Sequence, residues 1–307
     1  MSSLQATASV GVIGGSGVYD IEGLTDIQRV NIDTPFGPPS DEIVVGTLGG
    51  VRVAFLPRHG RGHRISPSEL PARANVWAMK TLGVTNLLSV SAVGSLREEL
   101  RPRDIVIPDQ ILDRTKGVRP ATFFGEGIVA HIAFAEPYCP ELNETVYRAA
   151  QRVIDASNPE GADGEGPKVH LGGTMVVMEG PQFSTKAESH FYRQIGGDII
   201  GMTALPEAKL AREAEICYCT VAMVTDYDCW HESEEAVTVE MIVGNLLANA
   251  ELVKKIVASV VPDVAAGAKE EKCGCDQALA DALITNRETM PKEQVEKLGL
   301  LLNKYLR

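Results

Sequence analysis

Hydrophobic segments of strand length alternate along this chain with amphipathic segments of helix length. Short apolar runs bounded by turn residues are typical of buried strands, whereas apolar positions three and four residues apart indicate helices. The short runs predict strands over residues 10–13, 51–57, 86–91, 104–108, 175–178, 198–201 and 216–225. The amphipathic pattern predicts helices over residues 71–82, 142–156, 185–195, 205–214 and 238–261. This alternation favours an α/β protein.

Local signals refine this outline. Ser66 and Thr185 are each followed three residues later by a glutamate, which is the spacing of a capping box at the start of a helix. Residues 157–167 are polar and rich in glycine and proline, which predicts a surface loop and not a domain boundary, because strands continue on both sides. We expect a main domain over residues 1–262 and a helical tail over residues 263–307.

Composition excludes several classes of protein. With 307 residues, of which 44% are hydrophobic, the chain is long enough to bury a sizeable core. A net charge of −12 and an acidic pI argue against a nucleic-acid partner, which would need a basic face. No run approaches the roughly 18 apolar residues of a membrane span, and the N-terminus lacks a signal-peptide pattern. We expect no membrane partner and a cytoplasmic location.

Two carboxylates follow the strand predicted over residues 216–225, namely Asp226 and Asp228. On extended backbone, side chains two residues apart point the same way, so both acids are expected to reach one ligand. When two carboxylates are close together, the pKa of at least one of them is raised, because the charge of the first opposes ionisation of the second. Such an acid suits proton donation to a leaving group near neutral pH. The alternative is a surface turn with two solvated acids.

Three segments at strand ends are candidates for binding an anion: residues 14–17, 57–64 and 89–95. The first offers the Ser16 hydroxyl among glycines, the second the Arg58 guanidinium and the His59 ring, and the third the Ser91 hydroxyl and the Ala92 amide. The first segment matches neither a dinucleotide fingerprint nor a P-loop. Taken singly, each segment is also compatible with an ordinary turn or surface loop.

The six cysteines do not form the pattern of a secreted disulfide framework. Four of them lie in or beside apolar segments and are expected to be buried thiols: Cys139, Cys217, Cys219 and Cys229. The pair Cys273-Gly-Cys275 lies in a charged tail and suits a disulfide, half of a soft-metal site or two inert thiols. A metal would need two further ligands, and the tail offers no histidine and no other cysteine, so no metal site is expected.

Eight segments in the same order resemble one enzyme family. They are GVIGGSGVYD near the start, DTPFGPPSD at 33–41, RHGRGH at 58–63, SAVGSLREEL at 91–100, AEPYCP at 135–140, MEGPQFSTKAES at 178–189, GMTALPEAKLARE at 201–213 and VTDYDCWHE at 224–232. Over residues 9–258 the chain is similar to the 5′-methylthioadenosine phosphorylases, a branch of the trimeric purine nucleoside phosphorylases. Its Cys-Gly-Cys tail resembles bacterial and archaeal members.

The resemblance implies a single α/β domain whose mixed central sheet partly closes into a barrel and is flanked by helices. It implies that inorganic phosphate attacks C1′ of methylthioadenosine, releasing adenine and 5-methylthioribose 1-phosphate without a metal or redox cofactor. The residues implied to hold phosphate are Ser16, Arg58, His59, Ser91, Ala92 and Thr203. Met202 is expected against the ribose and Phe183 beside the purine. We expect Asp226 to protonate N7 and Asp228 to accept from the exocyclic amine.

The resemblance also bears on the base and on assembly. Relatives that use 6-oxopurines carry glutamate and asparagine where this chain has Ser184 and Asp226, which favours adenine. His131 is expected to reach across a subunit boundary toward the 5′-methylthio group, making the functional unit an oligomer, most simply a homotrimer. The apolar stretch around Phe123, Phe124 and Phe134 agrees with such an interface, because a monomer is expected to expose it.

Three alternatives remain open at this stage. A broader purine nucleoside phosphorylase would use adenosine as well. A nucleotide-binding oxidoreductase is suggested only by residues 14–17, and the missing fingerprint argues against it. A silent nucleoside-binding protein would not need the set of Arg58, His59, Asp226 and Asp228.

Overall fold

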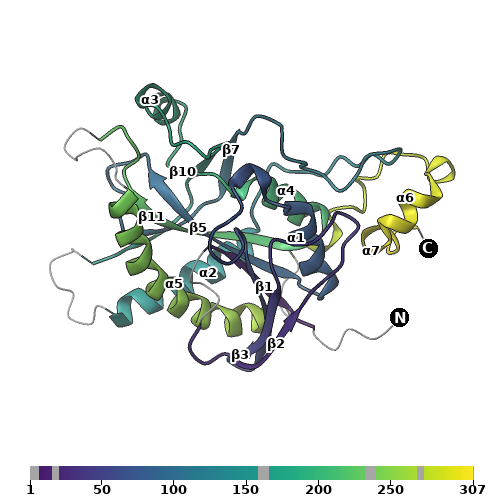
Figure 1. Ribbon diagram of the computed structural model, residues 1–307, viewed down its shortest axis with the longest axis horizontal. Helices are drawn as coiled ribbons and strands as arrows, with labels where there is room; N and C mark the ends of the chain where they lie inside the picture. The colour runs from purple at the N-terminus through teal and green to yellow at the C-terminus, as the bar shows by residue number, and fades with distance from the viewer. Residues whose placement is uncertain (1–6, 16–20, 158–165, 232–238, 268–272, 307) are drawn as a thin grey trace.

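The computed structural model describes residues 7–15, 21–157, 166–231, 239–267 and 273–306, and shows one α/β domain (Figure 1). Its strands are β1 (Val10–Gly14), β2 (Thr25–Val30), β3 (Ile43–Leu48), β4 (Val51–Pro57), β5 (Asn86–Ser95), β6 (Ile105–Ile107), β7 (Gln110–Arg114), β8 (Val169–Leu171), β9 (Thr174–Met178), β10 (Ile199–Gly201) and β11 (Cys217–Asp226). Its helices are α1 (Ala72–Thr81), α2 (Pro140–Ser157), α3 (Lys186–Gln194), α4 (Ala204–Glu213), α5 (Val239–Gly267), α6 (Lys292–Lys297) and α7 (Gly299–Leu302). Short 3-10 turns are η1 (Pro67–Glu69), η2 (Cys275–Gln277) and η3 (Arg287–Thr289).

The sheet is mixed and branches at β5. One path runs β2-β3-β4-β1-β5-β10-β9-β7, while β11 also pairs with β5 and leads on to β6 and β8. The strands β1, β4, β5 and β11 are parallel to one another. Hydrogen bonds between the described strands do not close the sheet into a barrel. The two branches are nevertheless connected through the chain, because β6 is followed directly by β7 and β8 directly by β9.

Helices cover both faces of the sheet, and a hydrophobic core lies on each side. Helices α1 and α4 pack in the core that includes Trp77, Met79 and Leu210. Helices α2 and α5 pack in the other core, with Val146 and Val257 fully buried (Figure 1). The expected mixed α/β fold flanked by helices is therefore confirmed.

Each segment predicted as a strand or a helix contains one, but four strands were missed. The side chains of β2 are exposed along most of its length, so it contains no apolar run. Strands β7 and β8 are short, and most of their side chains are partly or fully exposed. Strand β3 begins with an apolar run, but the sequence prediction did not include it. The Thr185 capping box begins α3 as predicted, whereas the Ser66 box caps the 3-10 turn η1 and not α1. Most of the predicted loop at residues 157–167 lies outside the described residues.

The C-terminal segment packs against the body of the domain. Leu279, Leu298, Leu301 and Leu302 are buried in the same core as α1 and α4. Helix α5 continues through Pro262 as far as Gly267, and residues 273–306 follow as short turns and helices beside the long segment after β7 (Figure 1). In the described part of the chain, no helix combines the length and apolar character that a membrane crossing requires.

Candidate active site

A cavity of about 360 Å³ opens at the carboxyl ends of the parallel strands. Gly15, Arg58 and Asp226 lie at or directly after the ends of β1, β4 and β11, and all three line it. The other predicted residues that line the cavity are His59, Ser91, Ala92, Phe183, Met202, Thr203 and Asp228. This volume falls within the range of roughly 300–1,000 Å³ that is typical of small-molecule sites. The structure therefore brings the three candidate anion-binding segments and the two acids to one place.

Arg58 is almost completely buried and is held by a carboxylate. Its Nε donates to Glu207 Oε1 over 2.5 Å, and its Nη2 contacts Ser89 Oγ at 2.7 Å. Nη1 donates to the carbonyl of Val90 over 2.8 Å. The side chains of Arg58 and Glu207 are only 1% and 2% exposed, so each charge depends on the other. Glu207 offsets the positive charge of Arg58. Hydrogen-bond donors, more than net positive charge, would therefore stabilise an anion in the cavity.

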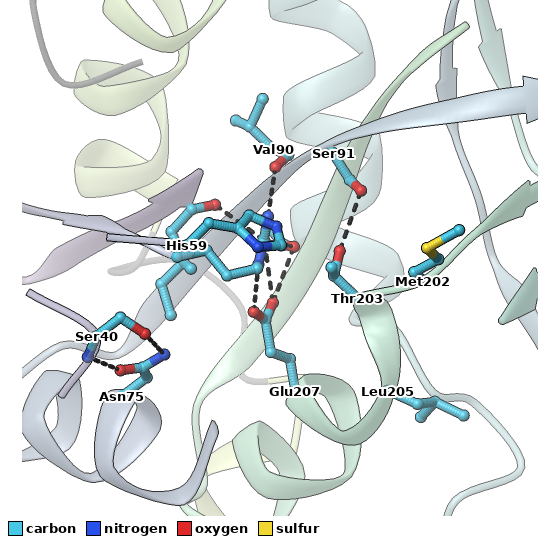
Figure 2. Close-up of polar contacts among 12 residues, drawn as sticks. Ser40, His59, Asn75, Val90, Ser91, Met202, Thr203, Leu205 and Glu207 are labelled. Atoms are coloured by element: carbon cyan, nitrogen blue, oxygen red, sulfur yellow. Dashed lines mark hydrogen bonds and ion pairs between the residues drawn. The ribbon is translucent and has the colours of Figure 1, made fainter. Parts of the chain in front are cut away.

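Two hydroxyl groups face each other at the anion-binding end of the cavity. Ser91 Oγ from β5 lies 3.1 Å from Thr203 Oγ1 at the start of α4, and Figure 2 shows the two side chains pointing toward one another. Both residues are buried, at 7% and 6% exposed. One hydroxyl can donate to the other, which in turn donates to an anion oxygen, and without their mutual bond both can donate to the anion. The pair therefore suits the phosphate role predicted for both residues.

His59 occupies the same end of the cavity in a defined protonation state. Its Nδ1 lies 2.8 Å from the carbonyl oxygen of Ile65, which can only accept, so the ring proton is on Nδ1. Burial lowers the pKa of His59 to about 4, which leaves the ring neutral at pH 7. Its Nε2 consequently accepts a hydrogen bond. The sequence suggested His59 as a donor to the anion; in this neutral tautomer its Nε2 suits a protonated phosphate oxygen.

The two carboxylates converge for a different reason from the one predicted. Strand β11 ends at Asp226 with a register shift against β5, and Asp228 lies beyond it with a left-handed φ of 51°. The extended-backbone argument for their common direction is therefore wrong, because a bulge and a turn aim both groups into the cavity. Gly94 of β5 leaves room for them, since a Cβ there would lie 3.0 Å from Asp226 Oδ1.

The environments of the two acids differ. Asp226 Oδ1 accepts the backbone N–H of Asp228 over 2.8 Å, and Oδ2 lies 2.7 Å from the Thr225 hydroxyl. Burial raises the pKa of Asp228, and the hydroxyl groups of Ser189 and Ser184 offset part of that rise. Asp228 Oδ2 is buried with no hydrogen-bond partner among the described residues. The geometry thus favours Asp228 as the acid that carries a proton.

A second buried ion pair, absent from the sequence prediction, supports the wall of the cavity at Met202. Arg119 Nε donates to Glu179 Oε1 over 2.8 Å, and its Nη1 donates to the carbonyls of Met202 and Leu205. Glu179 also accepts the N–H of Lys116 over 2.8 Å. The ion pair therefore holds the backbone at Met202 against the segment that follows β7, which contains Lys116 and Arg119.

Three predicted residues are not among those that line the cavity. Ser16 lies outside the described residues, although its neighbour Gly15 is at the cavity wall. Ser184 is half-buried behind Asp228, and its carbonyl accepts from Cys229 Sγ over 3.2 Å. His131 is exposed, and its N–H donates to the carbonyl of Ala282 over 2.8 Å.

The apolar stretch near His131 is covered by its own chain. Phe123 and Phe124 are 4% and 7% exposed, and the Phe123 ring lies 5.3 Å from Phe36 and 5.6 Å from Trp77. The argument that a monomer would expose this stretch is therefore wrong for Phe123 and Phe124, which belong to the core, whereas Phe134 is only partly buried.

Sequence reasoning missed Glu207, Glu179 and Arg119, together with much of the apolar lining. That lining includes Pro67, Val93, Met178, Pro181, Ile200 and Met223. Glu207 and Glu179 lie within segments that carry the family resemblance, and this was the available signal.

An α/β fold whose strand ends bring hydrogen-bond donors for an anion and two carboxyl groups to one cavity agrees with the class of enzymes that the sequence resembles, which act on nucleosides with phosphate. Residues 9–262 match the family model described as the phosphorylase superfamily, and the chain belongs to that family.

Similar proteins agree with this assignment. The chain is 58% identical over 298 residues to an S-methyl-5′-thioadenosine phosphorylase of Gloeobacter violaceus, covering 97% of this chain and 96% of that protein. A crystal structure of a methylthioadenosine phosphorylase from an antarctic soil metagenomic library is 49% identical, with a TM-score of 0.89 and coverage of 97% and 100%. A mutant of adenosine/methylthioadenosine phosphorylase from Schistosoma mansoni, in complex with methylthioadenosine, is 36% identical, with a TM-score of 0.80 and coverage of 94% and 100%.

Proposed function

We propose that the protein catalyses the phosphorolysis of 5′-methylthioadenosine to adenine and 5-methylthioribose 1-phosphate. The observation that carries this proposal is the shared cavity, in which anion-binding groups and two carboxyl groups face one space. The names of the similar proteins support the choice of substrate. A phosphate oxygen bonds to C1′, the bond between C1′ and N9 breaks, and adenine leaves with a proton on N7. Inorganic phosphate is a co-substrate, and the balanced reaction needs no redox cofactor.

The phosphate end of the cavity supplies the nucleophile and stabilises the sugar. Cleavage of the glycosidic bond leaves positive charge on the ribosyl ring, which an adjacent phosphate anion offsets. We assign the binding of that phosphate to Ser91, Thr203 and His59, with Arg58 behind them, and retain Ser16 as a further hydroxyl donor expected from the sequence. Holding phosphate and nucleoside in one cavity also makes the attack effectively intramolecular.

The base end supplies the proton that adenine needs in order to leave. Asp226 accepts two hydrogen bonds and suits acceptance from the exocyclic amine as well, whereas Asp228 suits donation to N7. This reverses the roles inferred from the sequence for the two acids. Phe183 lies at the rim with its ring 62% exposed, where a purine would cover it. We retain the proposed preference for adenine over 6-oxopurines, to which Ser184 contributes from behind Asp228.

Release of adenine from methylthioadenosine is expected to require inorganic phosphate, because the proposed nucleophile is phosphate and not water. The measurement compares adenine release in phosphate buffer and in phosphate-free buffer of equal ionic strength, and quantifies 5-methylthioribose 1-phosphate against adenine. We expect equal amounts of the two products with phosphate and only background release without it. Equally fast release in phosphate-free buffer would identify a hydrolase and contradict the proposal.

We further propose that the enzyme acts in the cytoplasm as a homotrimer whose sites are completed by neighbouring subunits. His131 is exposed beside Val129 and Ile284, which are 46% and 63% exposed. These three residues form a partly apolar surface where the C-terminal segment is hydrogen-bonded to the segment that carries His131.

Replacing His131 with alanine is expected to lower kcat/KM for methylthioadenosine by about tenfold, the lower end of the range for one pocket contact. The value for adenosine should change much less, because the proposed contact is to the 5′ substituent. Steady-state kinetics with both nucleosides measures the difference, and adenosine is the internal control. Equal losses for both, or a fully active monomer in sedimentation, would rule out the shared site.

A further inference from the structure

Four of the six cysteines come together far from the cavity, although they are distant in sequence. The sulfur atoms of Cys139, Cys217, Cys273 and Cys275, hereafter the four-cysteine cluster, all lie within 4.8 Å of one another. Cys217 begins β11, whereas Asp226 ends it, so about 30 Å of extended strand separates the cluster from the cavity. The cluster therefore has no contact with the chemistry proposed above.

We infer that the four-cysteine cluster binds one Zn²⁺ ion, which fastens the C-terminal segment to the body of the domain. Zinc bound by four thiolates is tetrahedral with bonds of about 2.3 Å, which places the sulfur atoms about 3.8 Å apart. The cluster already has nearly this spacing: Cys217 Sγ lies 3.3 Å from Cys273 Sγ. Two disulfides would bring sulfurs together only in pairs and would not require all six separations to be short.

Local structure explains how four distant residues reach one point. Cys139 directly precedes α2, and its N–H donates to the carbonyl of Tyr218, the residue after Cys217. Gly274 has a left-handed φ of 75°, which turns the chain between Cys273 and Cys275. The two missing ligands that the tail could not supply therefore come from the body, which corrects the sequence argument against a metal.

The surroundings suit thiolates bound to a metal. Cys139 lies at the N-terminus of α2, a helix of 18 residues whose dipole favours a negative charge there. Arg212 Nη1 lies 3.6 Å from Cys275 Sγ. Four thiols lose their protons to solvent when they bind a divalent ion, and the guanidinium offsets part of the remaining negative charge.

The four cysteines of the cluster differ in their exposure to solvent. Cys139 and Cys275 are 1% and 2% exposed and pack in the core with α2 and α5, whereas Cys217 and Cys273 are half-buried. The half-buried pair leaves a route by which an ion can enter, and the buried pair shields it from solvent.

Metal binding here has a structural consequence for the rest of the chain. The segment after Cys275 forms a bridge between Leu283 and Ala130, and Ile284 N–H donates to the carbonyl of Val129 over 3.0 Å. These bonds hold the segment that carries His131. An ion that fixes Cys273 and Cys275 to the body thus orders a surface on which the proposed subunit contact depends.

The test is an anaerobic titration of the fully reduced full-length protein with Zn²⁺, with Co²⁺ as a spectroscopic probe. We expect about one tightly bound ion per chain and the intense thiolate-to-metal absorption of tetrahedral Co²⁺. Replacing Cys273 and Cys275 together with serine should reduce binding to below about a tenth of an ion per chain. Cys219→Ala is the matched control, because it removes a buried thiol from β11 outside the cluster and should leave the stoichiometry unchanged.

A second measurement keeps the inference testable if the serine variant fails to fold. A chelator should lower the Tm of the zinc-loaded wild-type protein by several degrees, and a reductant alone should not. No Zn²⁺ binding by the reduced wild-type protein would overturn the inference. So would protein isolated under anaerobic, zinc-replete conditions whose Tm falls with reductant and not with chelator, since that result identifies disulfides.

Discussion

Replacing Arg58 with alanine is expected to destabilise the protein by about 3–5 kcal/mol, because Glu207 would remain buried without its partner. Glu207 is also bonded to Ser89 Oγ and to the Tyr218 hydroxyl, which hold it in the interior. The free energy of unfolding from denaturant titration measures this loss. The KM for phosphate should rise by about 10- to 100-fold in addition, the effect of losing a charged hydrogen bond.

A second variant separates the two effects. Arg58→Met combined with Glu207→Gln removes both charges and keeps an acceptor for Tyr218 and Ser89, so most of the stability should return. The high KM for phosphate should persist in this double variant if Arg58 contacts phosphate. A double variant with normal stability and a wild-type KM for phosphate would show that Arg58 only supports the fold.

Replacing Asp228 with asparagine is expected to lower kcat for methylthioadenosine by about 10²-fold or more, the scale of general acid catalysis. Asparagine has nearly the same shape but cannot give adenine a proton. A nucleoside whose base leaves readily without protonation should be affected much less. In the wild-type protein, kcat should fall as the pH rises through the raised pKa of Asp228, and the variant should lose this dependence.

Asp226→Asn is the matched comparison, because it changes the neighbouring acid in the same way. The sequence identified Asp226 as the donor, whereas burial raises the pKa of Asp228, and Asp226 accepts the Asp228 backbone N–H. A larger loss for Asp226→Asn, selective for the poor leaving group, would restore the original assignment. Equal losses with both kinds of nucleoside in both variants would exclude proton transfer by either acid.

The sequence predicted the elements whose signals are local. A strand such as β11 is recognisable because a long apolar run follows a helical pattern, and α3 because Thr185 and Glu188 mark its start. The segments that carry the family resemblance contain most of the residues that line the cavity, although only some of those residues were predicted by name. Strand β2 could not be found in this way, because an exposed edge strand needs no apolar side chains.

Only the tertiary structure decided which groups are paired and how they are charged. Arg58 and Glu207 are 149 residues apart in the chain, and no periodic pattern connects them. The neutral state of His59 and the raised pKa of Asp228 follow from burial, which depends on how β5, β11 and α4 pack. The four-cysteine cluster arises in the same way, because the tail folds back onto the first residue of β11. Spacing along a chain identifies candidate groups, but packing determines which partners and which solvent each of them meets.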